Sequence, residues 1–168
     1  VTGVQTCALP IFVNQYQNVS AIHLVSHGAE AEIIIGKNVY GTSQIDALSS
    51  ELQTWASHLT PNADLLLYGC DIAQGADGIA LINEVGRITQ THVAASTDST
   101  GALALNGNWV LEATTADIAA LNAFNFSVYQ NYKYELNAIT YNVTTGTNVD
   151  TNGVTTGLIG AGKLITFV

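Results

Sequence analysis

Two short motifs in the chain place a reactive side chain beside a glycine: His27-Gly28 and Gly69-Cys70. Each follows directly on an apolar run, "AIHLV" before the first and "DLLLY" before the second. A thiol beside an imidazole can carry out nucleophilic acyl transfer, in which the histidine takes the thiol proton or holds the thiolate as an ion pair. The glycines would let backbone come close to a substrate carbonyl, whose oxyanion nearby N–H groups would stabilise. The pattern indicates a catalytic His27/Cys70 pair.

Each of these residues also has a purely structural interpretation. A histidine at a strand end can simply bond to backbone, and a cysteine often serves as a small buried apolar side chain. His27 and Cys70 occur at matching positions after two strands, and this combination favours a pair over two unrelated structural residues. Whether the pair cleaves a substrate stays open. Asp71 either orients a partner or caps the following turn.

The surrounding periodicity predicts the elements that must hold this pair. Apolar runs over 21–26 and 64–68 are typical of strands buried on both faces, with Pro61-Asn62 breaking the chain before the second. Amphipathic stretches over 43–59 and 76–89 predict helices. The remaining predicted elements are a hairpin over 32–41, a strand over 91–97 and an edge strand or hairpin arm over 108–114.

The order strand, helix, strand, helix, strand predicts an α/β domain with a mostly parallel sheet flanked by helices. In an open parallel sheet, functional residues gather past the carboxyl ends of the strands. One crossover helix makes the strands before His27 and Cys70 neighbours, so we expect the sulfur and an imidazole nitrogen to lie within reach of each other.

The two predicted helices each have an apolar face that should be buried. Ser43 can cap the first helix, with Asp46 as its capping-box partner. We expect the two faces to lie on opposite sides of the sheet. The expected buried positions are Ile45, Leu48, Leu52, Trp55 and Leu59 on the first helix, and Ile79, Ile82, Val85 and Ile88 or their neighbours on the second.

Composition excludes several classes of function. With 13 acidic residues against four Lys and Arg, the net charge is −9, and such a surface does not suit binding to nucleic acid or anionic membranes. No apolar run approaches the roughly 18 residues that cross a bilayer, so no membrane insertion is expected. The low charged fraction of 10%, with many Thr, Asn, Ser and Gly, is typical of a secreted bacterial protein. No His/Cys spacing fits zinc, and no phosphate loop or G-x-S-x-G occurs, so we expect neither metal nor cofactor.

The two ends of the chain differ from the middle in composition and sequence pattern. Residues 1–11, "VTGVQTCALPI", resemble the translated read-through of a sequencing adapter, although an ordinary strand with a turn at Pro10 is the alternative. Excluding them leaves Cys70 as a lone thiol, which has no partner for an internal disulfide. With no Met in the chain, we expect a fragment. Residues 12–136 form the expected domain, and 137–168 are a Thr/Asn/Gly-rich linker or the start of a β-rich module.

A histidine-glycine after one strand and a cysteine after the next resemble the caspase-like cysteine peptidases, which include gingipains, separase and self-cleaving toxin domains. Four ordered blocks, "IHLVSHG", "ADLLLYGCDIAQGADG", "HVAASTDSTG" and "NWVLE", are more closely similar to the family of unknown-function domains numbered 4347. That family occurs near the N-termini of large bacterial surface and adhesin-like proteins. The resemblance covers about residues 19–130 and implies a caspase-like fold whose first strand, before residue 12, was lost with the true N-terminus.

The resemblance also implies roles for individual residues and a location. His27 would be the base, Cys70 the nucleophile, and Gly28 part of the oxyanion loop with Gly69 beside it. The residues expected to flank the substrate are Ser26, Asp71, Ala95, Ser96 and Thr97. The implied protein is secreted or lies at the cell surface, and its substrate is a peptide or its own chain. The alternative is a non-catalytic domain of the same fold that serves adhesin assembly, secretion or recognition.

Overall fold

The computed structural model describes residues 16–124, 130–137, 139–142, 147–150 and 155–156. Its main sheet has four strands in the order β1-β5-β6-β7. The neighbours β1, β5 and β6 are parallel, and β7 is antiparallel to β6. The strand bounds are Val19–Val25 for β1, Leu59–Tyr68 for β5, His92–Ala95 for β6 and Ala113–Thr114 for β7. The predicted mixed α/β fold with a mostly parallel sheet is therefore confirmed.

The strand β5 runs through the centre of this sheet, and the six residues Ala63–Tyr68 are all buried. That burial explains its continuous apolar run, since a strand covered on both faces has no solvent-facing positions. The predicted break at Pro61-Asn62 was wrong, because β5 already begins at Leu59. The register against β1 shifts between Val19 and Ala21, and Asn62 has a φ of 60°, so a bulge takes the place of a break.

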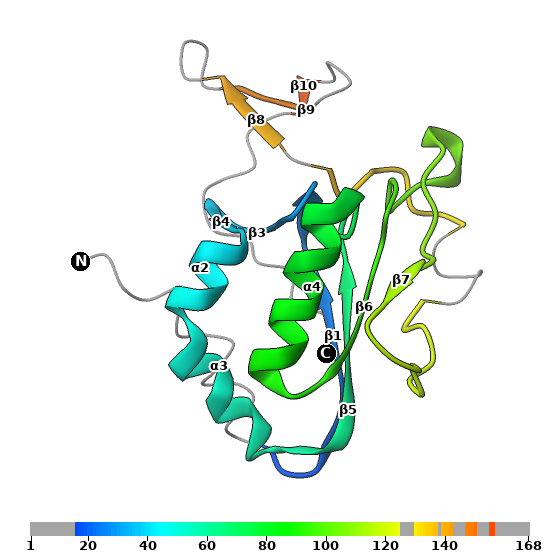
Figure 1. Cartoon of the computed structure of the whole chain (residues 1–168). Coiled ribbons are helices and arrows are strands. Elements are labelled where there is room, and N and C mark those ends of the chain that lie inside the picture. Colours follow the sequence, from blue (N-terminus) through cyan, green and yellow to red (C-terminus); the bar gives the residue numbers. More distant parts are fainter. Residues whose placement is uncertain (1–15, 125–129, 138, 143–146, 151–154, 157–168) are drawn as a thin grey trace.

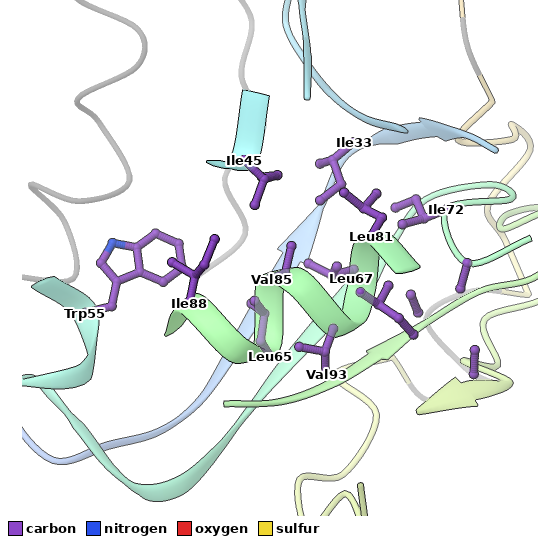
Figure 2. Packing of buried hydrophobic residues seen from close by; sticks show 14 residues of the cluster. Ile33, Ile45, Trp55, Leu65, Leu67, Ile72, Leu81, Val85, Ile88 and Val93 are labelled. Carbon is purple, nitrogen blue, oxygen red and sulfur yellow. The ribbon is translucent and has the colours of Figure 1, made fainter. Parts of the chain in front are cut away.

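Three helices lie on one face of the sheet: α2 (Thr42–Ala47), α3 (Ser49–Ala56) and α4 (Gly75–Thr89). Figure 1 shows α2 and α3 beside α4, which crosses in front of the strands. Ile45, Trp55 and Val85, one from each helix, belong to a single buried cluster, of which Figure 2 shows the packing. The prediction that the two helical faces lie on opposite sides of the sheet was wrong.

The predicted first helix is two helices, because the backbone at Leu48 leaves helical geometry with a φ of −97° and a ψ of 10°. Its predicted cap was also wrong. The helix begins after Gly41, whose N–H donates to the Gln44 side chain over 3.2 Å, and the Ser43 hydroxyl donates to the same Gln44 oxygen. The predicted partner Asp46 takes no part in this cap.

The predicted helix phases are right for α2 and α3 and partly wrong for α4, and Leu59, predicted on the first helix, is instead the first residue of β5. Trp55 is 4% exposed and Ile45 is buried, while Leu48 and Leu52 are half-buried. Ile79, however, is 41% exposed. It lies about 100° round the helix from the buried Gly78 and so points away from the sheet. The buried positions of α4 are Gly78, Leu81, Ile82, Val85, Ile88 and Thr89.

The opposite face of the sheet is covered by irregular chain and aromatic side chains. Tyr68 on β5 is fully buried, with Trp109, Phe124 and Tyr132 in the same cluster. The Tyr68 ring meets Phe124 edge-on at a centroid distance of 5.1 Å, and the Trp109 and Phe124 rings are 4.3 Å apart. Alternate residues of β5 therefore face two different cores, one covered by helices and one by loops.

Smaller elements complete the fold. The strands β2 (His27–Ala29), β3 (Glu32–Ile35) and β4 (Asn38–Tyr40) form an antiparallel sheet, so the predicted hairpin over 32–41 is confirmed. A short 3-10 helix, η1, spans Leu103–Leu105. A third sheet contains β8 (Ile139–Asn142), β9 (Thr147–Asp150) and β10 (Thr155–Thr156), in the segment 137–168 that was expected to be a linker or the start of a β-rich module.

Residues 1–11 lie outside the described residues, so their interpretation as adapter sequence stays a prediction. Over the parts of the chain that the structure describes, no helix is both long and apolar enough to cross a membrane.

Candidate active site

The two motifs meet at the carboxyl ends of β1 and β5. These strands are adjacent and parallel, with Val25 opposite Tyr68, as the sequence predicted. The Ser26 N–H extends the pairing by donating to the Tyr68 carbonyl oxygen over 2.9 Å. His27 then begins β2, and Cys70 is the second residue after the end of β5. The histidine and the cysteine therefore both lie at the carboxyl end of the parallel strands.

Two glycines allow the motifs to approach each other closely. A Cβ atom on Gly28 would lie 2.5 Å from the carbonyl oxygen of Cys70 and 2.6 Å from a side-chain carbon of Ile72. A Cβ atom on Gly69 would lie 3.0 Å from the Ser26 carbonyl oxygen. Because those contacts are largely with backbone, which has little freedom to shift, a larger residue at Gly28 would push the motifs apart.

The thiol of Cys70 is fully buried on the aromatic side of the sheet. Its sulfur accepts a hydrogen bond from the Thr100 N–H at 3.1 Å and lies 3.4 Å from the Thr100 carbonyl oxygen, to which the S–H can donate. Burial raises the pKa of Cys70 to about 11, against the opposing effect of the Thr100 backbone, and the charges of Asp71 and Glu135 add to the rise. The cysteine is therefore a neutral thiol at neutral pH.

His27 is also neutral in this state. Its side chain is half-buried, and its Nδ1 is buried without a hydrogen bond. Burial lowers the pKa of His27, and the nearby backbone of Asn137 and Leu136 acts in the opposite direction. With both side chains neutral, the structure shows no preformed thiolate–imidazolium ion pair between Cys70 and His27. Cys70 bonds to Thr100, and no hydrogen bond joins it to His27 among the described residues.

Two backbone N–H groups converge on one carbonyl oxygen beside the thiol. The N–H of Gly28 donates to the Leu136 oxygen over 2.8 Å, and the N–H of Cys70 donates to the same oxygen over 3.4 Å. An oxyanion hole requires this arrangement, with donors from separate elements aimed at one point. The predicted roles differ here between the two glycines. Gly28 supplies a donor, whereas Gly69 makes room for the approach of the motifs.

The carbonyl belongs to an extended segment that lies along the loop after β6. The Leu136 N–H donates to the Thr100 oxygen, and the Ala102 N–H donates to the Tyr134 oxygen, each over 2.8 Å. Gly101 pairs antiparallel with Glu135. Gly101 has a φ of 147°, and a Cβ atom there would lie 2.3 Å from the Tyr134 oxygen, so glycine is required. Residues 134–137 and 100–102 form a short two-stranded ribbon at the site.

Sequence reasoning missed this ribbon. Residues 132–137 alternate apolar and polar side chains as a strand does, but pairing between residues so far apart in sequence leaves no local signal of the partner. A second clue was Gly101, inside the "HVAASTDSTG" block, because a glycine in an otherwise ordinary loop can mark close backbone approach.

The residues predicted to flank a substrate lie near this edge, and their hydrogen bonds go to the protein itself. The Ser26 hydroxyl donates to the His27 oxygen. Asp71 adopts a φ of 60°, accepts from the Gln74 side chain at 3.0 Å, and has its pKa raised by burial and by Asp98. The arrangement resembles the local turn that was one of the two interpretations of Asp71.

The three residues after β6 are tied down in a similar way. Ala95 is buried in the helix-side core, and Ser96 is fully buried with its hydroxyl donating to the Asp98 oxygen. The Thr97 N–H donates to the Glu112 carboxylate over 2.9 Å. Their expected contact with substrate stays a prediction, and in this structure the next residues, Thr100–Ala102, hold the extended segment.

An open cavity of about 440 Å³ adjoins the site on the side of Asn137. Gly28, Asp71 and Ser99 contribute to its lining, together with the acidic residues Glu30 and Glu135. Within the described residues, no group of three or more His, Cys, Asp or Glu side chains could hold a metal ion.

Comparison with known proteins gave one result. The model of one family, Domain of unknown function (DUF4347), matches residues 6–136. Neither the curated proteins nor the solved structures gave a match.

Proposed function

The chain belongs to the DUF4347 family, and from the geometry of its site we propose that it is a caspase-like cysteine peptidase with a His27/Cys70 pair. The observation that carries the proposal is the convergence of the Gly28 and Cys70 N–H groups on one carbonyl oxygen beside the thiol. A buried structural cysteine does not require two donors aimed at a carbonyl. An acyl-transfer nucleophile does, because the oxygen becomes negatively charged in the transition state.

The proposed reaction has two halves, acylation of Cys70 and hydrolysis of the resulting thioester. The Cys70 sulfur attacks a peptide carbonyl carbon as its proton passes to His27, and the two N–H groups hold the resulting oxyanion. The carbon–nitrogen bond then breaks, and the His27 proton goes to the leaving amine. A water molecule attacks the thioester with His27 as its base, which releases the carboxyl product and restores the thiol. The hydrogen bond between His27 and Cys70 forms on the way to the transition state.

The substrate class in this proposal is a peptide, or the protein's own chain, outside the cell or at its surface. The resemblance to caspase-like peptidases and to domains of large bacterial surface proteins supports this context. So does the low charged fraction of 10%. We propose self-processing during surface display as the role.

One observation favours a second candidate, a non-catalytic domain for adhesin assembly, secretion or recognition. The Cys70 thiol is fully buried, and its pKa is raised to about 11, which are the properties of an inert structural cysteine. In the catalytic proposal this burial reflects the extended segment that covers the site, and an external peptide or probe reaches the thiol only when the segment leaves.

Thiol chemistry separates the two candidates. The purified chain is treated with a peptidyl acyloxymethyl ketone, and the labelled residue is identified by mass spectrometry. The peptidase account predicts labelling of Cys70 that is lost in His27→Ala and kept in His58→Ala, a change at a histidine whose ring bonds to Tyr16 far from the site. Cys7→Ser is the matched cysteine control. Equal labelling of Cys70 with and without His27 contradicts the proposal. The absence of labelling in a chain that has been unfolded and refolded also contradicts it.

A further inference from the structure

We infer that the Tyr134–Leu136 segment is the substrate of this site in cis, and that the chain is cleaved between Leu136 and Asn137. The inference rests on the proposed peptidase function and adds to it the bond that is cut and the side chain that is recognised. The oxyanion donors have an unusual occupant in this chain. The carbonyl oxygen held by Gly28 and Cys70 belongs to the chain itself.

The backbone of the segment is bound as a peptidase binds a substrate. Leu136 donates to Thr100 and Tyr134 accepts from Ala102, so alternate residues bond to the loop after β6 in antiparallel pairing. Such strand addition gives affinity through the main chain and leaves the side chains to define specificity. In this register Leu136 is the residue before the scissile bond, and its carbonyl lies in the oxyanion hole.

The Leu136 side chain occupies an apolar pocket. It is 8% exposed and belongs to the aromatic-side cluster, together with Tyr68, Trp109 and Cys70 itself. A pocket of this kind selects an aliphatic side chain, because a charged one would lose its hydration without gaining a partner. The recognised substrate class is therefore a peptide with leucine or a similar aliphatic residue before the cut.

The residue after the proposed scissile bond, Asn137, lies in surroundings that allow cleavage. Asn137 pairs with Gly28 and lines the open cavity, where water can reach the site and the new amine can depart. His27 lies beside the backbone of both Leu136 and Asn137, so its proton can pass to the leaving nitrogen. The family match also ends at residue 136, and the cut would release the matched domain from residues 137–168.

The proposed step is balanced without any co-reactant except water. The Cys70 sulfur bonds to the Leu136 carbonyl carbon, the bond from that carbon to the Asn137 nitrogen breaks, and the nitrogen takes the proton from His27. Hydrolysis of the thioester leaves a carboxyl group on Leu136 and a thiol on Cys70. The products are one chain ending at Leu136 and one beginning at Asn137.

Intact mass spectrometry tests the inference directly. The full chain is purified under reducing conditions, incubated at neutral pH and weighed at intervals, next to Cys70→Ala, Leu136→Asp and Leu136→Met. We expect wild type and Leu136→Met to give the fragments 1–136 and 137–168, and the other two variants to remain intact. Leu121→Asp is the matched control, since that leucine is 88% exposed, and it should be cut like wild type.

The outcomes separate this inference from the proposed function. Cleavage that requires Cys70 but falls at another bond, or that proceeds unchanged in Leu136→Asp, overturns the cis-substrate assignment and leaves a peptidase. A folded wild-type chain that stays intact and also fails to react with a Tyr-Glu-Leu acyloxymethyl ketone at Cys70 overturns both. A thermal midpoint within a few degrees of wild type shows that Leu136→Asp is folded. If Leu136→Asp does not fold, the comparison of wild type with Leu136→Met, which retains the aliphatic contact, takes its place.

Discussion

The two faces of the central sheet are built in different ways, although they share the strand β5. Leu65 and Leu67 point to a face covered by three helices, whereas Leu66 and Tyr68 point to one covered by loops and aromatic rings. Cys70 continues the second set. The helical face holds a continuous aliphatic core (Figure 2). The Cys70 thiol and the Leu136 side chain of the candidate site lie on the looped face.

This division separates stability from chemistry. Helices that pack through aliphatic side chains form a rigid support, and loops at the strand ends can carry groups whose arrangement must change during a reaction. The segment 134–137 contacts the looped face through Leu136, and no residue of it belongs to the helical core.

The largest expected effect is on the helical face. Trp55→Ala removes a side chain that is 4% exposed, and it should lower the free energy of unfolding by about 3–5 kcal/mol. Chemical denaturation measures the change. Ile79→Ala is the control in the same helical layer, because that side chain is 41% exposed and its loss should cost about 0.5 kcal/mol or less. Equal costs for the two variants would mean that the observed helix phases are wrong.

A substitution at the junction of the motifs should affect chemistry more than stability. In Gly28→Ala the new Cβ would meet the Cys70 oxygen at 2.5 Å, so the two N–H donors no longer converge. We expect a loss of about 10²–10³-fold in self-cleavage and about 1–3 kcal/mol of stability. Gly41→Ala is the control, since its nearest contact would be an ordinary 3.4 Å. Retained cleavage in Gly28→Ala would show that Gly28 is no oxyanion donor.

The raised pKa of Cys70 predicts a weak point at high pH. The folded state favours the protonated thiol, so the stabilisation is complete below the ordinary value of 9.0 and is lost as the pH rises toward about 11. The thermal midpoint should therefore fall more steeply over this range in wild type than in Cys70→Ala. Tyr68 and Tyr132 also have a raised pKa and are present in both chains, and because Cys70 contributes to the rise at Tyr132, the difference reports the thiol together with its effect on that tyrosine. Parallel curves would contradict the assigned burial of the thiol.

At acid pH the stability changes in the opposite direction, falling as the pH falls. The pKa of His27 is lowered by burial, so its contribution to stability is present above the ordinary value of 6.5 and is lost as the pH falls through the folded value. The difference in midpoint between wild type and His27→Gln should shrink as the solution is acidified. His23 has a lowered pKa for the same reason and remains in both chains.

The smallest expected effect is at the N-terminus. Deleting residues 1–11 should leave the thermal midpoint unchanged within error, because they show no pattern continuous with the domain and resemble adapter sequence. The family match begins at residue 6, so residues 6–11 are the part on which the outcome bears most. A fall of several degrees would show that the segment belongs to the fold.

Much of the helical face could be predicted from the sequence, since local periodicity determines it. The alternation of elements predicted the parallel pairing of β1 with β5, and the spacing of Ile45 and Trp55 predicted their burial. The sequence led to a wrong prediction where two apolar residues of one helix both fit the spacing of a buried face. Ile79 and Ile82 both fit an apolar stripe, and only packing against the sheet decides which of them turns inward.

The looped face could be predicted only in part. His27, Gly28 and Cys70 stood out because they follow strands, and the structure brings their backbones together. The ribbon between 100–102 and 134–137 could not be predicted, because the alternation over 132–137 indicates a strand but not its partner, which lies more than thirty positions away. For the same reason no sequence pattern indicated that the N–H groups of Gly28 and Cys70 both donate to the Leu136 carbonyl.

The most direct test of the central claim is a crystal structure of the full chain carrying Cys70→Ala, which the account expects to remain uncut. The distances from the Leu136 carbonyl oxygen to the backbone nitrogens of residues 28 and 70 are the quantities to measure. The account predicts that both lie within hydrogen-bonding range, as the 2.8 and 3.4 Å separations here do. A Leu136 carbonyl that points away from both nitrogens, with either N–H bonded elsewhere, would contradict it.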